Sequence, residues 1–111
     1  MSTHTDIVRQ SLEKGFDPEV FRKLGTEDMT FYSAHLGLDL KGRDAVADAL
    51  GKAFAGGGKP SFQLQGDPVE QGNFVVVFYR ATLSSGEERE ICQVVRFAGD
   101  DKISGAWTMR A

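Results

Sequence analysis

The C-terminal part of this sequence predicts three consecutive β-strands joined by short turns. NFVVVFYRAT at 73–82 is followed by the turn Ser84-Ser85-Gly86 and by EREICQVVRF at 88–97. A second turn over 98–101 leads into KISGAWTM at 102–109. A three-stranded meander is not stable alone, because its apolar side chains need a layer that covers them. The rest of the chain is therefore expected to supply helices, and a curved sheet packed on helices can enclose a pocket.

Length and charge limit the possible functions. The 111 residues are expected to form one domain, 1–111, because two domains of half this size would each be too small to bury a core. The formal net charge is −3, so no basic field attracts phosphates and nucleic-acid binding is disfavoured. No apolar run approaches the ~20 residues that a membrane span needs. The predicted partners therefore include neither nucleic acid nor membrane.

Cysteine and histidine usage indicates the compartment and the cofactors. Cys92 is the only cysteine, so an intrachain disulfide is impossible and a cytoplasmic location is expected. The N-terminus has no apolar signal-peptide core. Two histidines and one cysteine give no metal-ligand spacing, so neither a metal nor another cofactor is predicted.

Helical signals precede the meander. A first helix is predicted over 6–14, begun by Thr3 and Asp6. A second lies between Asp17-Pro18, which suit a helix start, and Gly25, which suits the left-handed position after a helix. The clearest helix is RDAVADALGKAFA at 43–55. Its apolar stripe at helical spacing consists of Ala45, Val46, Ala49, Leu50, Ala53 and Phe54.

Shorter strands complete the pattern. MTFYS at 29–33 predicts a first strand, and 34–41 a loop or short hairpin that turns at Gly37. SFQLQGD at 61–67 alternates apolar and polar residues, which predicts a strand with one solvent-exposed face, and Pro68 predicts a sheet edge or a bulge nearby. Helices followed by strands indicate an α+β fold with a mainly antiparallel sheet.

Alternation along the meander separates two faces of the sheet. The middle strand places Ile91, Gln93, Val95 and Phe97 on one face and Cys92, Val94 and Arg96 on the other. The strand FVVVFY at 74–79 is apolar on both faces, whereas a strand covered on one side only would alternate. We therefore expect helices on one face and a second copy of the chain on the other, which makes a homodimer.

Three stretches carry a resemblance to a known superfamily. They are LGTEDMTFYS after the two short helices, GRDAVADALGKAF, and GNFVVVFYRATLSSGEEREICQVVRFAGDDKISGAW. Together they resemble the nuclear transport factor 2-like superfamily, in particular its SnoaL-like and ketosteroid-isomerase-like members. The resemblance implies a cone-shaped fold, in which a strongly curved sheet wraps around one long and two short helices and forms a pocket. Many members are dimers through the outer sheet face.

The ketosteroid isomerases allow a test of chemistry. They use a carboxylate base, with a tyrosine and a protonated aspartic acid that stabilise the oxyanion. By the resemblance, the base falls on Ser33, the aspartic acid on Gln93 and the tyrosine near Arg9. A serine hydroxyl is no base near neutral pH without an activating partner, whereas Gln93 can still donate a hydrogen bond. This chain is therefore expected not to be a ketosteroid isomerase.

His35 and Asp39 are the candidate catalytic residues. An imidazole suits acid–base chemistry near neutral pH, and Asp39 could orient His35 across the turn at Gly37. An exposed loop histidine explains His35 as well. Gln93 could either donate to a ligand or be a glutamine that bonds a neighbouring backbone group.

The other candidate ligand-binding residues are Tyr32, Ser33, Tyr79 and Trp107. The two tyrosines have an apolar body and a polar tip, which suits a pocket for a mostly apolar ligand, but core or interface packing explains them equally well. Trp107 could line the pocket or fill the dimer interface.

Three functional hypotheses follow. The chain could bind a small, largely apolar metabolite without catalysis. It could be a cofactor-independent isomerase, cyclase, dehydratase or hydrolase that acts on a ring-containing metabolite. It could also be a structural dimerisation domain in which side chains fill the pocket. Fold alone does not separate these hypotheses.

Overall fold

The computed structural model describes residues 3–13, 19–34, 37–55, 61–83, 85–99 and 101–110. Within these ranges the chain forms three helices and seven strands. In order they are α1 (Thr3–Glu13), α2 (Glu19–Leu24), β1 (Gly25–Ser33), β2 (Leu38–Lys41), α3 (Arg43–Ala55), β3 (Ser61–Leu64), β4 (Val69–Gln71), β5 (Phe74–Thr82), β6 (Glu88–Ala98) and β7 (Lys102–Arg110). None of the described helices is long and apolar enough to span a bilayer.

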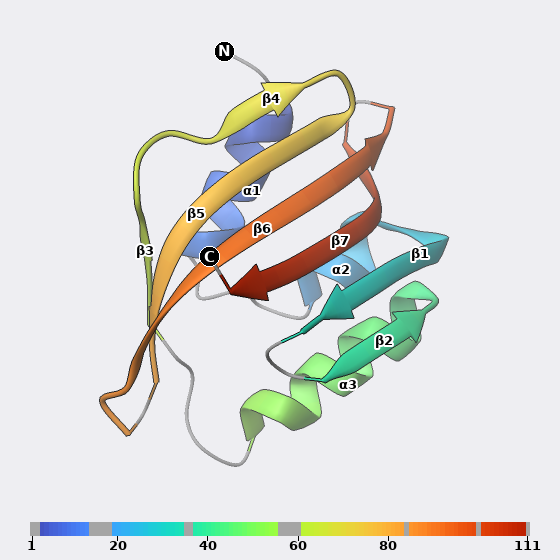
Figure 1. Cartoon of the computed structure of the whole chain (residues 1–111). Coiled ribbons are helices and arrows are strands. Elements are labelled where there is room, and N and C mark those ends of the chain that lie inside the picture. The colour runs from blue at the N-terminus through green and yellow to red at the C-terminus, as the bar shows by residue number, and fades with distance from the viewer. Residues whose placement is uncertain are drawn as a thin grey trace.

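All the strands belong to one curved sheet (Figure 1). The strand order is β2-β1-β7-β6-β5-β3, and β4 also pairs with β5. Every pairing is antiparallel except that of β1 with β7, which is parallel. β3 and β4 share one edge of β5, because β4 pairs with its first three residues and β3 with its last four. The predicted meander β5-β6-β7 is therefore the centre of the sheet.

The three helices lie on one side of the sheet, behind it in Figure 1. α1 packs on β3, β4 and β5, whereas α3 packs on β1, β2 and α2. We call the face that the helices cover the inner face and the opposite one the outer face. The core between helices and inner face includes Val8, Leu12, Phe21, Val46, Leu50, Met29, Phe31, Val75, Val77, Ile91, Val95, Phe97 and Ala106.

Burial along β6 confirms the predicted alternation. Ile91, Gln93, Val95 and Phe97 are buried, whereas the residues between them are only half-buried. β5 alternates as well: Val75 and Val77 are buried, while Phe74 and Phe78 on the outer face are 40% and 47% exposed. The apolar outer face of β5 is therefore open in the single chain.

The prediction for Gly25 was wrong. Gly25 does not adopt a left-handed conformation after α2 but is the first residue of β1. A Cβ atom there would lie 2.5 Å from the carbonyl oxygen of Phe21 and 2.6 Å from Sδ of Met29. Glycine is needed because helix and strand meet without a loop, so that the backbone passes too close to α2 for any side chain.

α3 has the predicted bounds, but its buried face is rotated slightly from the predicted stripe. Val46 and Leu50 are buried as expected, Ala47 is buried too, and Ala45 is exposed. The side chains of 53–55 lie outside those described. α3 packs on both β1 and α2, and two neighbouring elements bury a wider face of a helix than one element does.

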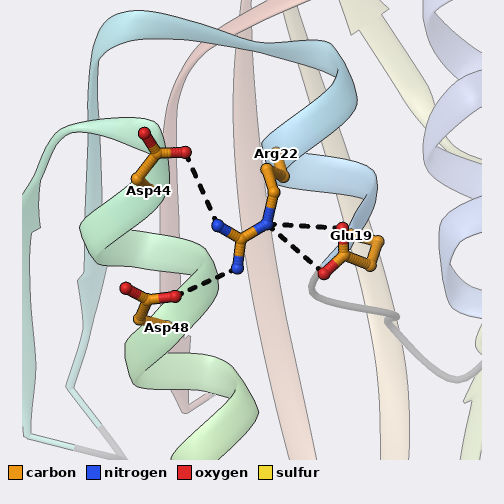
Figure 2. A network of polar contacts seen from close by, with 4 residues as sticks. All are labelled: Glu19, Arg22, Asp44 and Asp48. Carbon is orange, nitrogen blue, oxygen red and sulfur yellow. Dashed lines mark hydrogen bonds and ion pairs between the residues drawn. The ribbon is translucent and has the colours of Figure 1, made fainter.

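Arg22 on α2 links α2 to α3 on the exposed side of these helices (Figure 2). Its Nη2 donates to Oδ1 of Asp48 at 3.0 Å, and Nη1 lies 3.6 Å from Oδ1 of Asp44. Its Nε donates to Glu19 within α2 at 3.3 Å. Asp44 and Asp48 are one helical turn apart, so one guanidinium can reach both. These contacts position α2, which is too short to be stable alone.

Candidate functional site

Three polar side chains lie side by side on the inner face, one on each of three neighbouring strands. Gln93 of β6 is paired with Thr108 of β7, and Thr108 is paired with Ser33 of β1. All three are buried: Gln93 is 1% exposed, Thr108 3% and Ser33 0%. We call this row the polar stripe. Neighbouring strands are ~4.8 Å apart, so the stripe spans roughly 10 Å across the sheet.

Gln93 has an unsatisfied polar group. Its Nε2 is buried and has no hydrogen-bond partner in the part of the chain that the structure describes. Its cross-strand neighbour on β5 is the apolar Val77, and Ile91 and Val95 flank it along β6. A buried amide without a partner costs about 1–3 kcal/mol. Most buried polar groups in proteins are satisfied, so this amide is a candidate position for a ligand or an ordered water.

Tyr79 lies diagonally across from Gln93 on the inner face. It pairs with Ile91, two residues before Gln93, and diagonal neighbours of this kind are within reach of an aromatic side chain. Its ring packs edge-on against Phe62 at 5.3 Å between centroids. Burial, with a smaller contribution from the Cys92 thiol, raises the pKa of Tyr79 above its ordinary range. The phenol is therefore a neutral donor at physiological pH.

The structure places Tyr32 and Trp107 on the outer face, away from the polar stripe. Tyr32 is paired with Trp107 and is 43% exposed. The Trp107 ring covers Gly105, and the guanidinium of Arg96 lies 5.3 Å from the ring centroid. Of the predicted ligand-binding residues, Ser33, Tyr79 and Gln93 thus share the inner face, whereas Tyr32 and Trp107 are available for a different contact.

The predicted pair His35 and Asp39 is only partly described. His35 lies outside the described residues. Asp39 is on β2, is exposed and is paired with Tyr32, so it belongs to the outer face. Gly37 has a φ of 69°, as the predicted hairpin turn requires. Asp39 is therefore not part of the polar stripe.

The family follows from a comparison with known proteins. A model of the SnoaL-like domain matches residues 9–106. This chain is a member of the SnoaL-like domain family. The resemblance inferred from the sequence is thereby confirmed, and so are the α+β fold class and the cone-like architecture of sheet and helices. None of the curated proteins matches this SnoaL-like domain.

Solved structures show the same fold. A proposed isomerase of the SnoaL-like family from Agrobacterium tumefaciens is 20% identical, with a TM-score of 0.74 over 100% of this chain and 99% of that one. An uncharacterised cystatin-fold protein from Novosphingobium aromaticivorans is 19% identical, with a TM-score of 0.76 over 99% of both chains. A proposed ketosteroid isomerase from Kribbella flavida is 12% identical, with a TM-score of 0.76 over 98% of this chain and 78% of that one. At these identities the similarity establishes the fold alone.

Sequence reasoning missed two residues of this SnoaL-like domain. Thr108 belongs to the polar stripe, and its face follows only once the register of β7 against β6 is known. His4 is buried in α1, where Nδ1 lies 3.1 Å from Oε2 of Glu70 and Nε2 lies 2.8 Å from the carbonyl oxygen of Gly99. Its ring stacks on Phe97 at 4.2 Å between centroids. His4 thus fastens the first turn of α1 to β4 and to the β6–β7 turn.

A small cleft lies between α1 and α2, apart from the polar stripe. Its volume is about 190 Å³, and its lining consists of Ile7, Gln10, Ser11, Val20, Lys23 and Leu24. It contains none of the predicted site residues. No group of three or more potential metal ligands occurs among the described residues of the domain.

Proposed function

We propose that this SnoaL-like domain binds a small, largely apolar metabolite against the inner face of its sheet. The observation that carries the proposal is the buried Nε2 of Gln93, which has no partner among the described residues. Apolar residues surround the amide, and Thr108 and Tyr79 add two neutral hydroxyl groups on neighbouring strands. A mostly apolar wall with a few convergent polar groups is typical of sites for small molecules.

Binding without catalysis is the function that the described residues support best. Their buried polar side chains on the stripe are an amide and two hydroxyls, and none of these is a general base near neutral pH. Asp39 is exposed on the outer face. A cofactor-independent enzyme acting on a ring-containing metabolite would need a titratable group next to the stripe. His35 is the candidate that the sequence offers for that role.

A ligand screen with matched variants tests the proposal. Neutral metabolites with one or two rings are added to the wild type, and the melting temperature is measured, because a ligand of the native state stabilises it by mass action. We expect at least one compound to raise the melting temperature of the wild type and of Cys92→Ser, but not that of Gln93→Met. Cys92 is adjacent to Gln93 on β6 and faces the opposite way. Equal shifts in all three proteins would contradict the assignment of the site.

We also propose that two copies associate through their outer faces. Val69, Val76, Val94, Trp107 and Tyr32 form a continuous cross-strand row over five strands of that face. Val69 and Tyr32 are 57% and 43% exposed, so a single chain leaves a broad apolar surface in water. A second copy offers the same apolar surface, and two sheets can pack face to face.

Light scattering tests the association. We expect the mass of two chains for the wild type at micromolar concentration. Val94→Glu introduces a charge at the middle of the row and should give the mass of one chain. Ala45→Glu adds the same charge on the exposed side of α3 and should leave the dimer intact. A wild-type mass of one chain would refute the proposal.

A cytoplasmic location is proposed as well. The sequence has a single cysteine, and disulfide-linked frameworks are typical of exported small domains. Cell fractionation with an antibody to the chain tests this directly, and recovery outside the cytoplasm would overturn it.

A further inference from the structure

The chemistry of Gln93 restricts the ligand to a narrower chemical class than largely apolar metabolites in general. A carboxamide is planar and carries Oε1 on the same carbon as Nε2. A ligand carbonyl that accepts a hydrogen bond from Nε2 therefore brings a substituent of its carbonyl carbon opposite Oε1. If that substituent is an N–H group, it donates to Oε1 and the pair closes two reciprocal hydrogen bonds. If it is a C–H group, only the bond from Nε2 forms, although the glutamine is 1% exposed.

The described surroundings of the amide favour a neutral ligand over a charged one. The buried polar side chains of the described residues are His4, Ser11, Ser33, Gln93 and Thr108. No carboxylate, ammonium or guanidinium is among them. Among these buried described residues, the one imidazole ring is that of His4, which is held by Glu70 and Gly99 and stacks on Phe97, four positions along β6 from Gln93. A buried ion beside Gln93 would therefore have no countercharge among the buried described residues, at a cost far above that of a neutral group.

We propose that the ligand is a neutral ring compound with a carbonyl next to a ring N–H, as in lactams, cyclic imides and oxo-pyrimidines. The inference rests on the proposed binding function. Gln93 donates from Nε2 to the ring carbonyl and accepts at Oε1 from the ring N–H. Thr108, one strand away in direct register, lies beside the same edge of the ring. The apolar side chains of the inner face contact the rest of the ring.

Three small probes test this ligand class. They are 2-piperidone, which has the C(=O)–N–H edge, N-methyl-2-piperidone, which has the carbonyl only, and cyclohexanecarboxylate, which is an anion. Binding is followed by ¹H–¹⁵N spectra of the full chain, in which the side-chain amide signal of Gln93 is identified by its loss in Gln93→Met. We expect 2-piperidone to shift that signal and to bind about threefold to tenfold more tightly than the N-methyl compound, which corresponds to one net hydrogen bond. Cyclohexanecarboxylate should not bind at the same site.

The variants separate the possible outcomes. In Gln93→Met the preference for 2-piperidone should disappear, whereas Cys92→Ser should retain it. Equal affinity of the two piperidones, or tighter binding of the carboxylate, would overturn the ligand class and leave the binding function standing. If neither these probes nor any neutral metabolite in the screen perturbs the amide signal, both the ligand class and the binding function are refuted. The wild-type comparison decides between the probes even if Gln93→Met fails to fold.

Discussion

Replacing Gln93 by methionine should raise the free energy of unfolding, because the substitution removes a buried amide whose Nε2 has no partner among the described residues. Leaving such a group unsatisfied costs about 1–3 kcal/mol. Methionine has a similar length, fills irregular space and carries no strong donor, and repacking of this kind usually costs below ~1.5 kcal/mol. The expected net gain is about 1 kcal/mol, or a rise in melting temperature of roughly 4 °C for a chain of this size.

Urea unfolding of ligand-free protein measures this gain. The midpoint should rise while the slope with denaturant stays constant, because the surface exposed on unfolding is nearly unchanged. Gln63→Met is the matched control, since Gln63 is an exposed glutamine on β3. A surface substitution of this kind should change stability by no more than about 0.5 kcal/mol. A Gln93→Met protein that is less stable than the wild type by about 1 kcal/mol would show that the amide is satisfied in solution, and the argument for a ligand at Gln93 would fail.

Three further predictions concern the scaffold. Gly25→Ala should lower the free energy of unfolding, measured with urea, by about 2 kcal/mol or more, because the alanine Cβ would lie 2.5 Å from a backbone oxygen of α2. Gly51→Ala in α3, where a Cβ meets nothing within 4 Å, should raise the free energy of unfolding by about 0.5–1 kcal/mol. Equal effects of the two substitutions would refute the clash at Gly25. Burial raises the pKa of Tyr79 in the folded protein, so its contribution to stability is complete below the unfolded value of about 10 and is lost as pH rises further. Absorbance at alkaline pH should show Tyr79 ionising only together with unfolding, and ionisation of Tyr79 while the protein stays native would contradict this. Arg22→Met removes the link from α2 to α3 and should speed amide hydrogen exchange in α2, and unchanged exchange would show that the ion pairs contribute nothing.

Local sequence signals were sufficient for the elements with strong periodicity. The strands of the meander and the helix 43–55 have their predicted bounds to within one residue, because apolar alternation and helical spacing are both pronounced there. β4 was not predicted, since its three residues are all exposed and carry no pattern. β1 begins four residues before the predicted start, at GTED, a segment of low strand propensity in which Gly25 pairs with Ile103 of β7 and the register is irregular up to Thr30. The strand predicted over 61–67 ends at Leu64.

The sequence could predict the face of a candidate site residue only where alternation within a single strand was enough. Alternation along β6 predicted that Gln93 and Cys92 lie on opposite faces of the sheet, and the burial pattern of β6 agrees. The faces of Tyr79 and Trp107 depend on how β5 and β7 are set against β6, and a bulge in β7 next to Gly105 makes simple alternation along that strand ambiguous. The contact of His4 with Glu70 joins positions 66 residues apart, and no local pattern encodes it.

The parallel pairing of β1 with β7 has a consequence for folding kinetics. Thr30 is paired with Gly105, 75 positions later, whereas β5, β6 and β7 pair with near neighbours in the chain. Contacts between distant segments stabilise the chain only after a long loop has closed, which costs conformational entropy. Chains rich in such contacts therefore fold slowly. The β1–β2 hairpin, with α3 packed on it, can join the sheet only after β7 has formed. During synthesis, the edge of β1 that pairs with β7 therefore stays unpaired until β7 becomes available.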